Sequence, residues 1–317
     1  MKIRIAPLWR WLGLLLWMVP VGAALAVCGT AQVAVQVLGS GGPVPDGDRA
    51  SSGYLVWIDG RSRLLVDAGG GTFLRFGQAG AKIADLDFIA ITHLHTDHVA
   101  DLPALLMGGF FADRARPLPL SGPTGGGAFP GMREFVVGLF DPKHGIFRYL
   151  GGFTDGSGGL FETPVTEVDA SRTTPQRIYA DARMQIAAIG VHHGPVPALG
   201  YLVTVRGKRI AFSGDQNGQN PQFARMIRGA DVLIMDHAVP EYAGPVARRL
   251  HAMPSEIGAL ARSAGVKELV LSHWMARSLV TWDRGLALIR ERYQGPVVSA
   301  KDLQCIVVTA AQDPRGK

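Results

Sequence analysis

Three histidines and an aspartate lie within six positions of the segment Thr92-His93-Leu94-His95-Thr96-Asp97-His98. The run 86–91 before it is largely apolar and short, which predicts a buried strand. Side chains on the turn that leaves such a strand can converge on one point. Because imidazole and carboxylate groups bind Zn²⁺ at about 2.0–2.2 Å, the segment predicts a metal site.

Further metal-binding side chains follow three later predicted strands. His192-His193 comes after the strand at 178–190, Asp215 after the strand at 209–212, and His273 after the strand at 268–271. The carboxyl ends of strands in α/β proteins place ligand-binding groups at one edge of the sheet. Two more histidines and one more aspartate would complete a site for two Zn²⁺ ions that share a carboxylate.

The elements that must position these residues are mixed in order along the chain. Hairpins come early and strands alternate with helices later, which indicates an α/β protein with two sheets covered by outer helices. Strands are expected at 33–38, 54–58, 63–66, 86–91, 178–190, 201–205, 209–212, 232–235, 268–271 and 305–309, and helices at 102–107, 132–139, 221–228, 254–264 and 282–293. The segment 140–162, rich in glycine and aromatic residues, is either a surface loop or a flap over the substrate.

On these motifs, residues 32–317 resemble the metallo-β-lactamase superfamily, whose fold is an αββα four-layer sandwich. The turn matches the H-x-H-x-D-H signature of that family, and Asp67 in Leu65-Val66-Asp67-Ala68-Gly69 matches the aspartate that supports the turn from the second shell. The resemblance implies that one zinc is held by His93, His95 and His193, that the other is held by Asp97, His98 and His273, and that Asp215 bridges the two.

Four short segments are similar to the ribonuclease Z and arylsulfatase branch: 38–41, 121–123, 197–201 and 271–274. His251 matches the histidine that contacts the scissile phosphate in ribonuclease Z, which implies a catalytic role. Ribonuclease Z also carries a long arm that grips transfer RNA. Only 21 residues separate His193 from Asp215, where that arm would be inserted. We therefore expect a small-molecule ester substrate and no transfer RNA.

The resemblance implies an exported dizinc hydrolase of phosphodiester or sulfate ester bonds. Metal-bound hydroxide would attack, since two metal ions lower the pKa of bound water toward 7. Asp97 would be catalytic as well as a ligand, by orienting that hydroxide. Iron or manganese at one site is an alternative to zinc. Hydrolysis of lactones or β-lactams on the same centre is the alternative reaction, and a non-catalytic zinc-binding protein is the alternative of another class.

The first 31 residues have the pattern of a signal peptide and leader. Three basic residues precede an apolar run at 11–27, and Ala24-Leu25-Ala26 is a cleavage motif. We expect a periplasmic or secreted protein with no stable membrane association after cleavage. A retained membrane anchor and lipid attachment at Cys28 are the alternatives. The sequence leaves open whether the protein forms a homodimer. Removing residues 1–26 lowers the net charge from +6 to +3, too little to indicate nucleic-acid binding.

The two cysteines are Cys28 and Cys305. An exported protein could join them, but two cysteines make no disulfide framework. We expect Cys28 to lie in a flexible leader. His237, at the end of a predicted strand, is either a second-shell or a structural residue.

Overall fold

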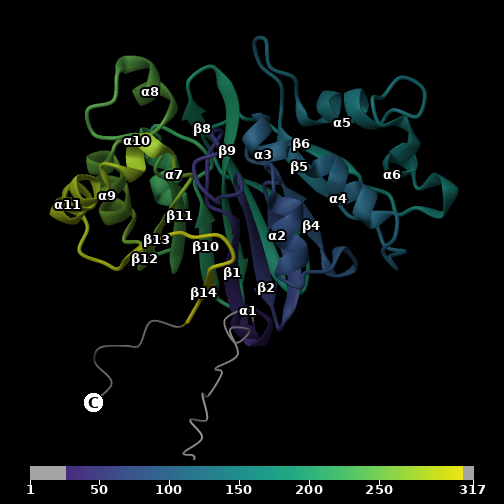
Figure 1. Ribbon diagram of the computed structural model, residues 1–317, viewed down its shortest axis with the longest axis horizontal. Coiled ribbons are helices and arrows are strands. Elements are labelled where there is room, and N and C mark those ends of the chain that lie inside the picture. Colours follow the sequence, from purple (N-terminus) through teal and green to yellow (C-terminus); the bar gives the residue numbers. More distant parts are fainter. Residues whose placement is uncertain (1–25, 310–317) are drawn as a thin grey trace, which may run out of the picture.

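The computed structural model describes residues 26–309, within which the strands form two facing seven-stranded sheets with helices outside both (Figure 1). The first sheet has the order β14 (Cys305–Val307), β1 (Val33–Gly39), β2 (Gly53–Ile58), β3 (Arg61–Val66), β4 (Phe88–Ala90), β5 (Leu120–Pro123), β6 (Val165–Val168). The second has the order β13 (Val297–Ser299), β12 (Glu268–Ser272), β11 (Val232–Asp236), β10 (Lys208–Phe212), β9 (Val196–Val205), β8 (Met184–His193), β7 (Gln176–Ala180). This confirms the predicted four-layer αββα fold.

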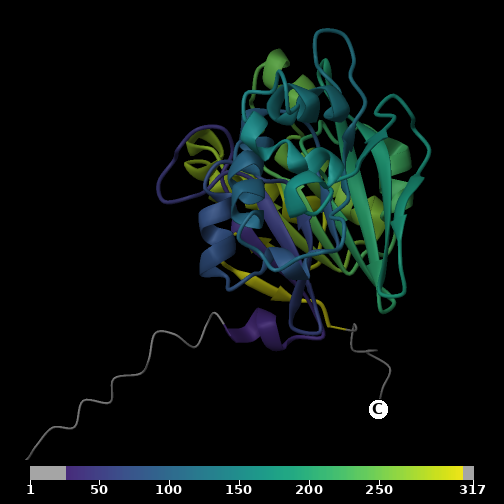
Figure 2. The same ribbon diagram turned by 90° about the vertical axis from the view of Figure 1, so that its right-hand side faces the viewer.

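Strand β1 shows why the sheets are buried on both faces. Val33, Val35 and Val37 point into the core between the sheets, whereas Ala34 and Leu38 point into the core beneath the outer helices. A strand that is covered on both faces has a nearly continuous apolar sequence, and residues 33–38 have this pattern. Figure 2 shows the sheets and the helices from the side.

Each sheet carries its own helices. Those that contribute to the core on the first sheet are α1 (Ala26–Thr30), α2 (Thr72–Gln78), α3 (Thr96–Val99), α4 (Leu102–Gly109), α5 (Met132–Phe140) and α6 (Gly152–Asp155), with the short 3₁₀ turns η2 (Ile83–Asp85) and η3 (Arg148–Leu150). A further 3₁₀ turn, η4 (Ser157–Gly159), buries no residue. Those on the second sheet are α7 (Pro221–Met226), α9 (Pro254–Ala264), α10 (Ala276–Leu279) and α11 (Trp282–Arg292). Helix α8 (Pro245–Leu250) lies at the upper end of the molecule in Figure 1.

Helix α9 illustrates how the sequence sets an element. Pro254 occupies its first turn, where a missing N–H costs nothing. The side chain of Glu256 accepts a hydrogen bond from the Met253 N–H at 2.9 Å. Gly265 ends the helix in the left-handed conformation, with φ 60°. The apolar residues between these signals face the second sheet, so the predicted bounds 254–264 are confirmed.

The segment 140–162 is folded against the first sheet. Phe140, Leu150, Phe153 and Phe161 are buried in the core that helices α2, α4 and α5 cover. Ile146 and Tyr149 are exposed on the same segment. A role as a flap over the substrate stays a prediction.

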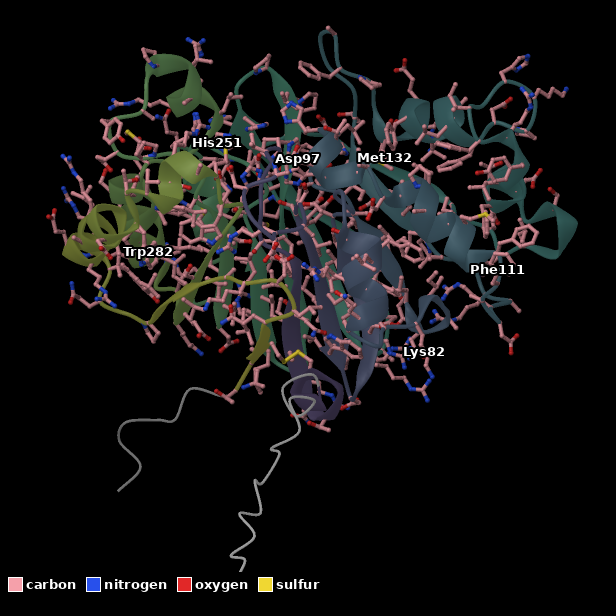
Figure 3. All side chains as sticks on the ribbon, in the orientation of Figure 1. Lys82, Asp97, Phe111, Met132, His251 and Trp282 are labelled. Atoms are coloured by element: carbon pink, nitrogen blue, oxygen red, sulfur yellow. A yellow bond between two sulfur atoms is a disulfide. The ribbon has the colours of Figure 1, made fainter. Side chains whose placement is uncertain are left out.

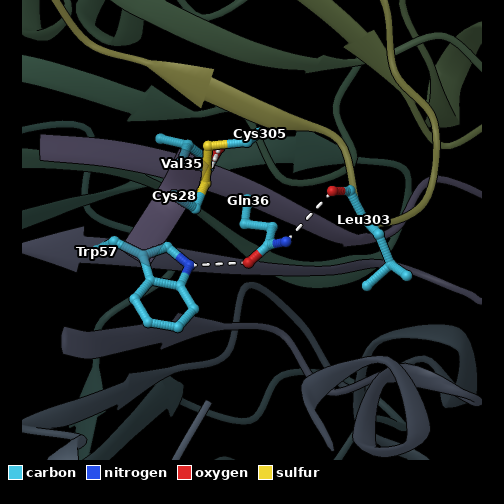
Figure 4. The surroundings of a disulfide bond; sticks show 6 residues. All are labelled: Cys28, Val35, Gln36, Trp57, Leu303 and Cys305. Atoms are coloured by element: carbon cyan, nitrogen blue, oxygen red, sulfur yellow. Dashed lines mark hydrogen bonds between the residues drawn. A yellow bond between two sulfur atoms is a disulfide. The ribbon is translucent and has the colours of Figure 1, made fainter. Parts of the chain in front are cut away.

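Cys28 and Cys305 form a disulfide that joins α1 to β14 across 277 positions (Figure 4). Cys28 is buried, so the expectation that it lies in a flexible leader is wrong. Next to it, Gln36 accepts a hydrogen bond from Trp57 Nε1 at 3.0 Å and donates one to the Leu303 carbonyl at 3.2 Å. The buried Cys28 is thus held against β14 by its bond to the partly buried Cys305.

The first 25 residues, with most of the predicted signal peptide and the alternative anchor, lie outside the described residues. Within the part of the chain that is described, no helix combines the length and the hydropathy needed to cross a bilayer.

Candidate metal centre

The predicted metal turn follows β4, and Asp67 contacts both its first residue and its last. Asp67 accepts hydrogen bonds from the Thr92 N–H at 2.7 Å and the Thr92 hydroxyl at 2.9 Å. The Nδ1 of His98 lies 2.9 Å from the same carboxylate. Asp67 itself has φ 59°, a conformation that non-glycine residues adopt rarely and at some energetic cost. A single carboxylate therefore fixes both the start of the turn and the ring of one ligand.

One group of side chains that could hold a metal ion comprises His93, His95 and His193. The Nε2 atoms of His93 and His193 lie 3.1 and 3.2 Å from His95 Nδ1. His193 comes from the end of β8, and its Nδ1 lies 2.8 Å from the Leu250 carbonyl. That contact requires the proton on Nδ1, which leaves the Nε2 lone pair facing the other two rings. His192 is exposed, so the structure brings His193 and not its neighbour to this group.

A second group comprises Asp97, His98, Asp215 and His273, all of them buried. His98 Nε2 lies 3.5 Å from Asp97 Oδ2 and 3.4 Å from Asp215 Oδ1. His273 Nε2 lies 3.1 Å from the Oδ2 atoms of both aspartates. Asp215 Oδ2 also lies 3.9 Å from His93 Nε2 and 3.8 Å from His193 Nε2. Asp215 therefore stands between the two groups.

These donor sets fit metal ions. Ligands bound tetrahedrally at about 2.0–2.2 Å stand roughly 3.3–3.6 Å apart, close to most of these separations. Nε2 of His98 is buried and makes no hydrogen bond within residues 26–309, although it faces two carboxylates. A buried nitrogen of this kind needs a partner, and a cation would supply it. The seven residues predicted as ligands are therefore brought together in one place.

The protonation states suit the two groups differently. Burial lowers the pKa of His93 well below its usual value and that of His193 to about 4. Both rings are then neutral at pH 7, the form that binds metal. Burial alone would raise the pKa of Asp215, but His273 and His98 hold it well below its usual value. The central carboxylate is therefore ionised.

His251 reaches the centre from the residue after α8. Its ring centroid lies 5.2 Å from that of His193 and 5.5 Å from that of His273. Figure 3 shows His251 and Asp97 at the same end of the molecule. The Nδ1 atom of His251 lies 2.9 Å from Oδ2 of Asp236, the last residue of β11. Burial raises the pKa of Asp236.

Asp236 is the residue that sequence reasoning missed. It follows the predicted strand 232–235, as Asp215 and His273 follow theirs, and that position was the available signal. Its neighbour His237 turns away and packs against the rings of Trp274 and Trp282, with centroids 4.9 and 6.3 Å away. Neither ring nitrogen of His237 has a hydrogen-bond partner among the described residues.

The mouth of the centre is a cavity of about 460 Å³. The polar residues that line it include His95, Asp97 and His251. Its walls are mostly apolar, with one cation: Pro43, Leu94, Leu250, Met275 and Arg277. Arg277 donates a hydrogen bond to the Ala238 carbonyl at 2.9 Å, which holds the guanidinium at the wall. The centre is thus open to a substrate that presents a negative group among apolar surfaces.

Comparisons with known proteins agree with this geometry. A family model described as a beta-lactamase superfamily domain matches residues 62–274. A ribonuclease Z of Methanosarcina acetivorans is 30% identical over 274 residues, which cover 77% of this chain and 88% of that protein. A ribonuclease Z of Mycolicibacterium paratuberculosis is 28% identical over 291 residues, with 88% and 99% covered. The crystal structure of the short form of human tRNase Z has a TM-score of 0.67 at 21% identity, with 87% and 100% covered.

These relatives contradict the expectation of a small-molecule substrate without transfer RNA. That expectation relied on the predicted export signal and on the 21 residues between His193 and Asp215, which the structure fills with β9 and β10. The segment lies outside both ligand groups, and chains named for ribonuclease Z are similar over most of their length. The absence of an inserted arm between His193 and Asp215 is therefore no ground for excluding transfer RNA as a substrate.

The matched model spans about two thirds of the chain and contains all of the predicted ligands. The facing sheets, the metal turn after β4 and the shared aspartate after β10 agree with that match. The chain belongs to the metallo-β-lactamase superfamily of metal-dependent hydrolases, with ribonuclease Z among its relatives.

Proposed function

We propose that this protein is a dizinc phosphodiesterase that cleaves phosphodiester bonds of RNA. The observation that carries the proposal is the meeting of two ligand groups at Asp215, beside a histidine that is paired with a buried carboxylate. The relatives named ribonuclease Z support RNA as the substrate class. Iron or manganese in place of one zinc would keep the same ligands.

Two bound metal ions would polarise the phosphoryl group and supply a nucleophile at neutral pH. Residues of the chain would orient the attacking water and bind the phosphate. Asp97 lines the cavity, where its carboxylate can accept a hydrogen bond from the attacking water and orient it. Arg277 can pair with a phosphate oxygen in the mouth, since guanidinium groups bind phosphate through parallel hydrogen bonds.

His251 is placed to act on the leaving group. Asp236 holds the proton on His251 Nδ1, so a second proton would sit on Nε2. From Nε2 the ring can donate to the departing oxygen as a general acid. Asp236 orients the ring.

A panel of substrates tests the proposal. Purified, zinc-loaded protein should cleave bis(p-nitrophenyl) phosphate and a 3′-extended transfer RNA precursor. The same preparation should leave p-nitrophenyl sulfate, a lactone and a chromogenic cephalosporin intact. Turnover of one of the last three, with no phosphodiester cleavage, would contradict the assignment, and cleavage of none would support a non-catalytic zinc-binding protein.

We also propose that the protein is exported. The basic residues, the apolar run 11–27 and the Ala24-Leu25-Ala26 motif support a cleaved signal peptide. The Cys28–Cys305 disulfide adds support, because such bonds persist in oxidising compartments. A sulfur held in a disulfide cannot also carry a thioether-linked lipid, which argues against lipid attachment at Cys28. RNA met outside the cytoplasm would then be the substrate.

A further inference from the structure

We propose that Asp302 is a positioning residue for the metal ligand His273, acting through the segment 40–50. The inference rests on the metal centre of the proposed function and not on its substrate. Asp302 lies between β13 and β14, 29 positions after His273. Three steps connect the two residues.

His273 lacks the support that two other ligands have. The Nδ1 of His98 is held by Asp67, and the Nδ1 of His193 by the Leu250 carbonyl. The Nδ1 of His273 is buried and has no hydrogen-bond partner in the described part of the chain. Histidine ligands usually depend on such a partner to fix the ring. His273 also has φ 60°, which its surroundings must maintain.

The segment 40–42 supplies the missing support through its backbone. The Trp274 N–H donates to the Ser40 carbonyl at 2.9 Å, and the Gly42 N–H donates to the Trp274 carbonyl at 3.1 Å. A Cβ atom at Gly42 would lie 2.7 Å from Cε1 and 2.9 Å from Nδ1 of His273. Glycine therefore lets the backbone lie directly against the ligand ring, and the ring's orientation follows the position of this segment.

Asp302 fixes that position. Its carboxylate accepts hydrogen bonds from the Ser40 N–H at 3.0 Å, the Ser40 hydroxyl at 2.8 Å and the Ala50 N–H at 2.7 Å. Arg75 Nε lies 3.1 Å away and balances the charge. One side chain, 11% exposed, thus ties both ends of the segment 40–50.

The loop that carries Asp302 is itself anchored to both sheets. The Ala300 N–H donates to the Leu271 carbonyl at 2.8 Å, and the Leu303 N–H donates to the Val37 carbonyl at 2.7 Å. Leu271 lies in β12 and Val37 in β1. Because both strands lead directly to the centre, Asp302 has a fixed base from which to position the segment.

The test titrates metal-free protein with Zn²⁺ in competition with a chromogenic chelator. Asp302→Asn keeps the shape of the side chain and removes its charge. The matched control is Asp231→Asn, because Asp231 is 8% exposed, accepts from the Arg209 N–H at 2.8 Å and pairs with Lys267 at 2.8 Å, before β11 and away from the ligands.

We expect Asp302→Asn to weaken one of the two zinc-binding steps by about 10-fold to 100-fold, the effect of losing a group that orients a ligand. The other step, at His93, His95 and His193, should be unchanged. Asp231→Asn should bind both ions like the unaltered protein. Two unchanged steps, or two steps weakened equally, would overturn the inference.

Gly42→Ala provides a second, independent variant if Asp302→Asn does not fold. Its methyl group would displace the His273 ring, so the same single step should weaken, and two unchanged steps would count against the inference. The titration contains no ester. Unaltered protein that binds two zinc ions and cleaves no phosphodiester would therefore refute the proposed function and leave this inference standing.

Discussion

At the scale of single residues, Asp215 is the side chain that lies between the two candidate ligand groups. One of its oxygens faces His98 and the other faces His93 and His193. Asp215→Ala should therefore reduce the affinity for both ions, by more than the roughly 10-fold to 100-fold typical of a second-shell change. Elemental analysis after dialysis measures this, with the half-exposed Asp59 replaced by alanine as the control. Two retained ions would refute the bridging assignment.

His251 and Asp236 should act as one unit that is separate from metal binding. His251→Ala should keep both zinc ions and lower kcat for bis(p-nitrophenyl) phosphate by about 10²-fold to 10⁴-fold, the usual contribution of a general acid. Asp236→Asn should lower kcat less, and the double variant should be no worse than His251→Ala alone. Undiminished kcat in His251→Ala would exclude the catalytic role.

His237 should make the protein less stable in mild acid. Burial lowers its folded pKa to about 4 from 6.5. The unfolded chain therefore takes up a proton first, and stability is lost as the pH falls from about 6.5 toward 4. This group alone should cost about 2 kcal/mol between pH 7 and pH 5.

The measurement is urea unfolding of the metal-free protein at both pH values. His237→Gln should lose about 2 kcal/mol less than the unaltered protein over this interval. Because the metal-binding histidines are present in both proteins, their contribution cancels. Equal losses would show that His237 does not titrate in this way.

The ligands could be predicted from sequence because their types are rare and each follows an apolar strand. The same rule applies to Asp236, but its pairing with His251 joins residues 15 positions apart that no local pattern connects. The contact between the Gly42 backbone and the His273 ring could not be predicted either, because no residue type or spacing signals a contact between a backbone and a ring.

At the scale of elements, bounds could be predicted where signals were local. Pro254 and Gly265 mark the ends of α9, whereas no apolar period marks α2, and the structure alone reveals it. The predicted strand 178–190 is in fact two strands, β7 and β8, joined by a turn in which Asp181 accepts from the Arg183 and Met184 N–H groups. Asp181 and Arg183 lie between two apolar stretches, and this polar interruption was the available signal for the turn.

The turn after β10 should tolerate no side chain at Gly214. Its φ is 57°, and a Cβ atom there would lie 2.6 Å from the Leu199 carbonyl oxygen and 3.0 Å from Thr92 Cβ. Gly214→Ala should lower the free energy of unfolding by about 1–3 kcal/mol or more and reduce zinc binding, because Asp215 is the next residue.

The matched control is Gly207→Ala in the turn between β9 and β10. Gly207 has φ 74° with no atom within 4 Å of the added methyl, so it shares the backbone strain without the collision. It should lower stability and leave zinc binding unchanged. Equal zinc binding by both variants would show that the collision at Gly214 does not matter for the site.

At the scale of the whole molecule, the centre forms where the strands of two sheets end together. Ligands come from the ends of β8, β10 and β12 in one sheet and from the turn after β4 in the other. The disulfide lies on β14 and α1, and Figure 1 places α1 at the end of the molecule opposite α3. The disulfide and the metal centre therefore lie at opposite ends of the molecule.

Export predicts both the mature N-terminus and the state of the two cysteines. Cleavage after Ala26 would leave Cys28 as the second residue, free to close the bond to Cys305. Mass spectrometry of protein from the periplasm or medium should show this terminus and no free thiol.

Cys305→Ser should lower the free energy of unfolding by about 2–4 kcal/mol and leave zinc binding intact, because neither sulfur lies among the ligands. A retained N-terminus with two free thiols would refute export, and weakened zinc binding in Cys305→Ser would show that the two ends of the molecule are coupled after all.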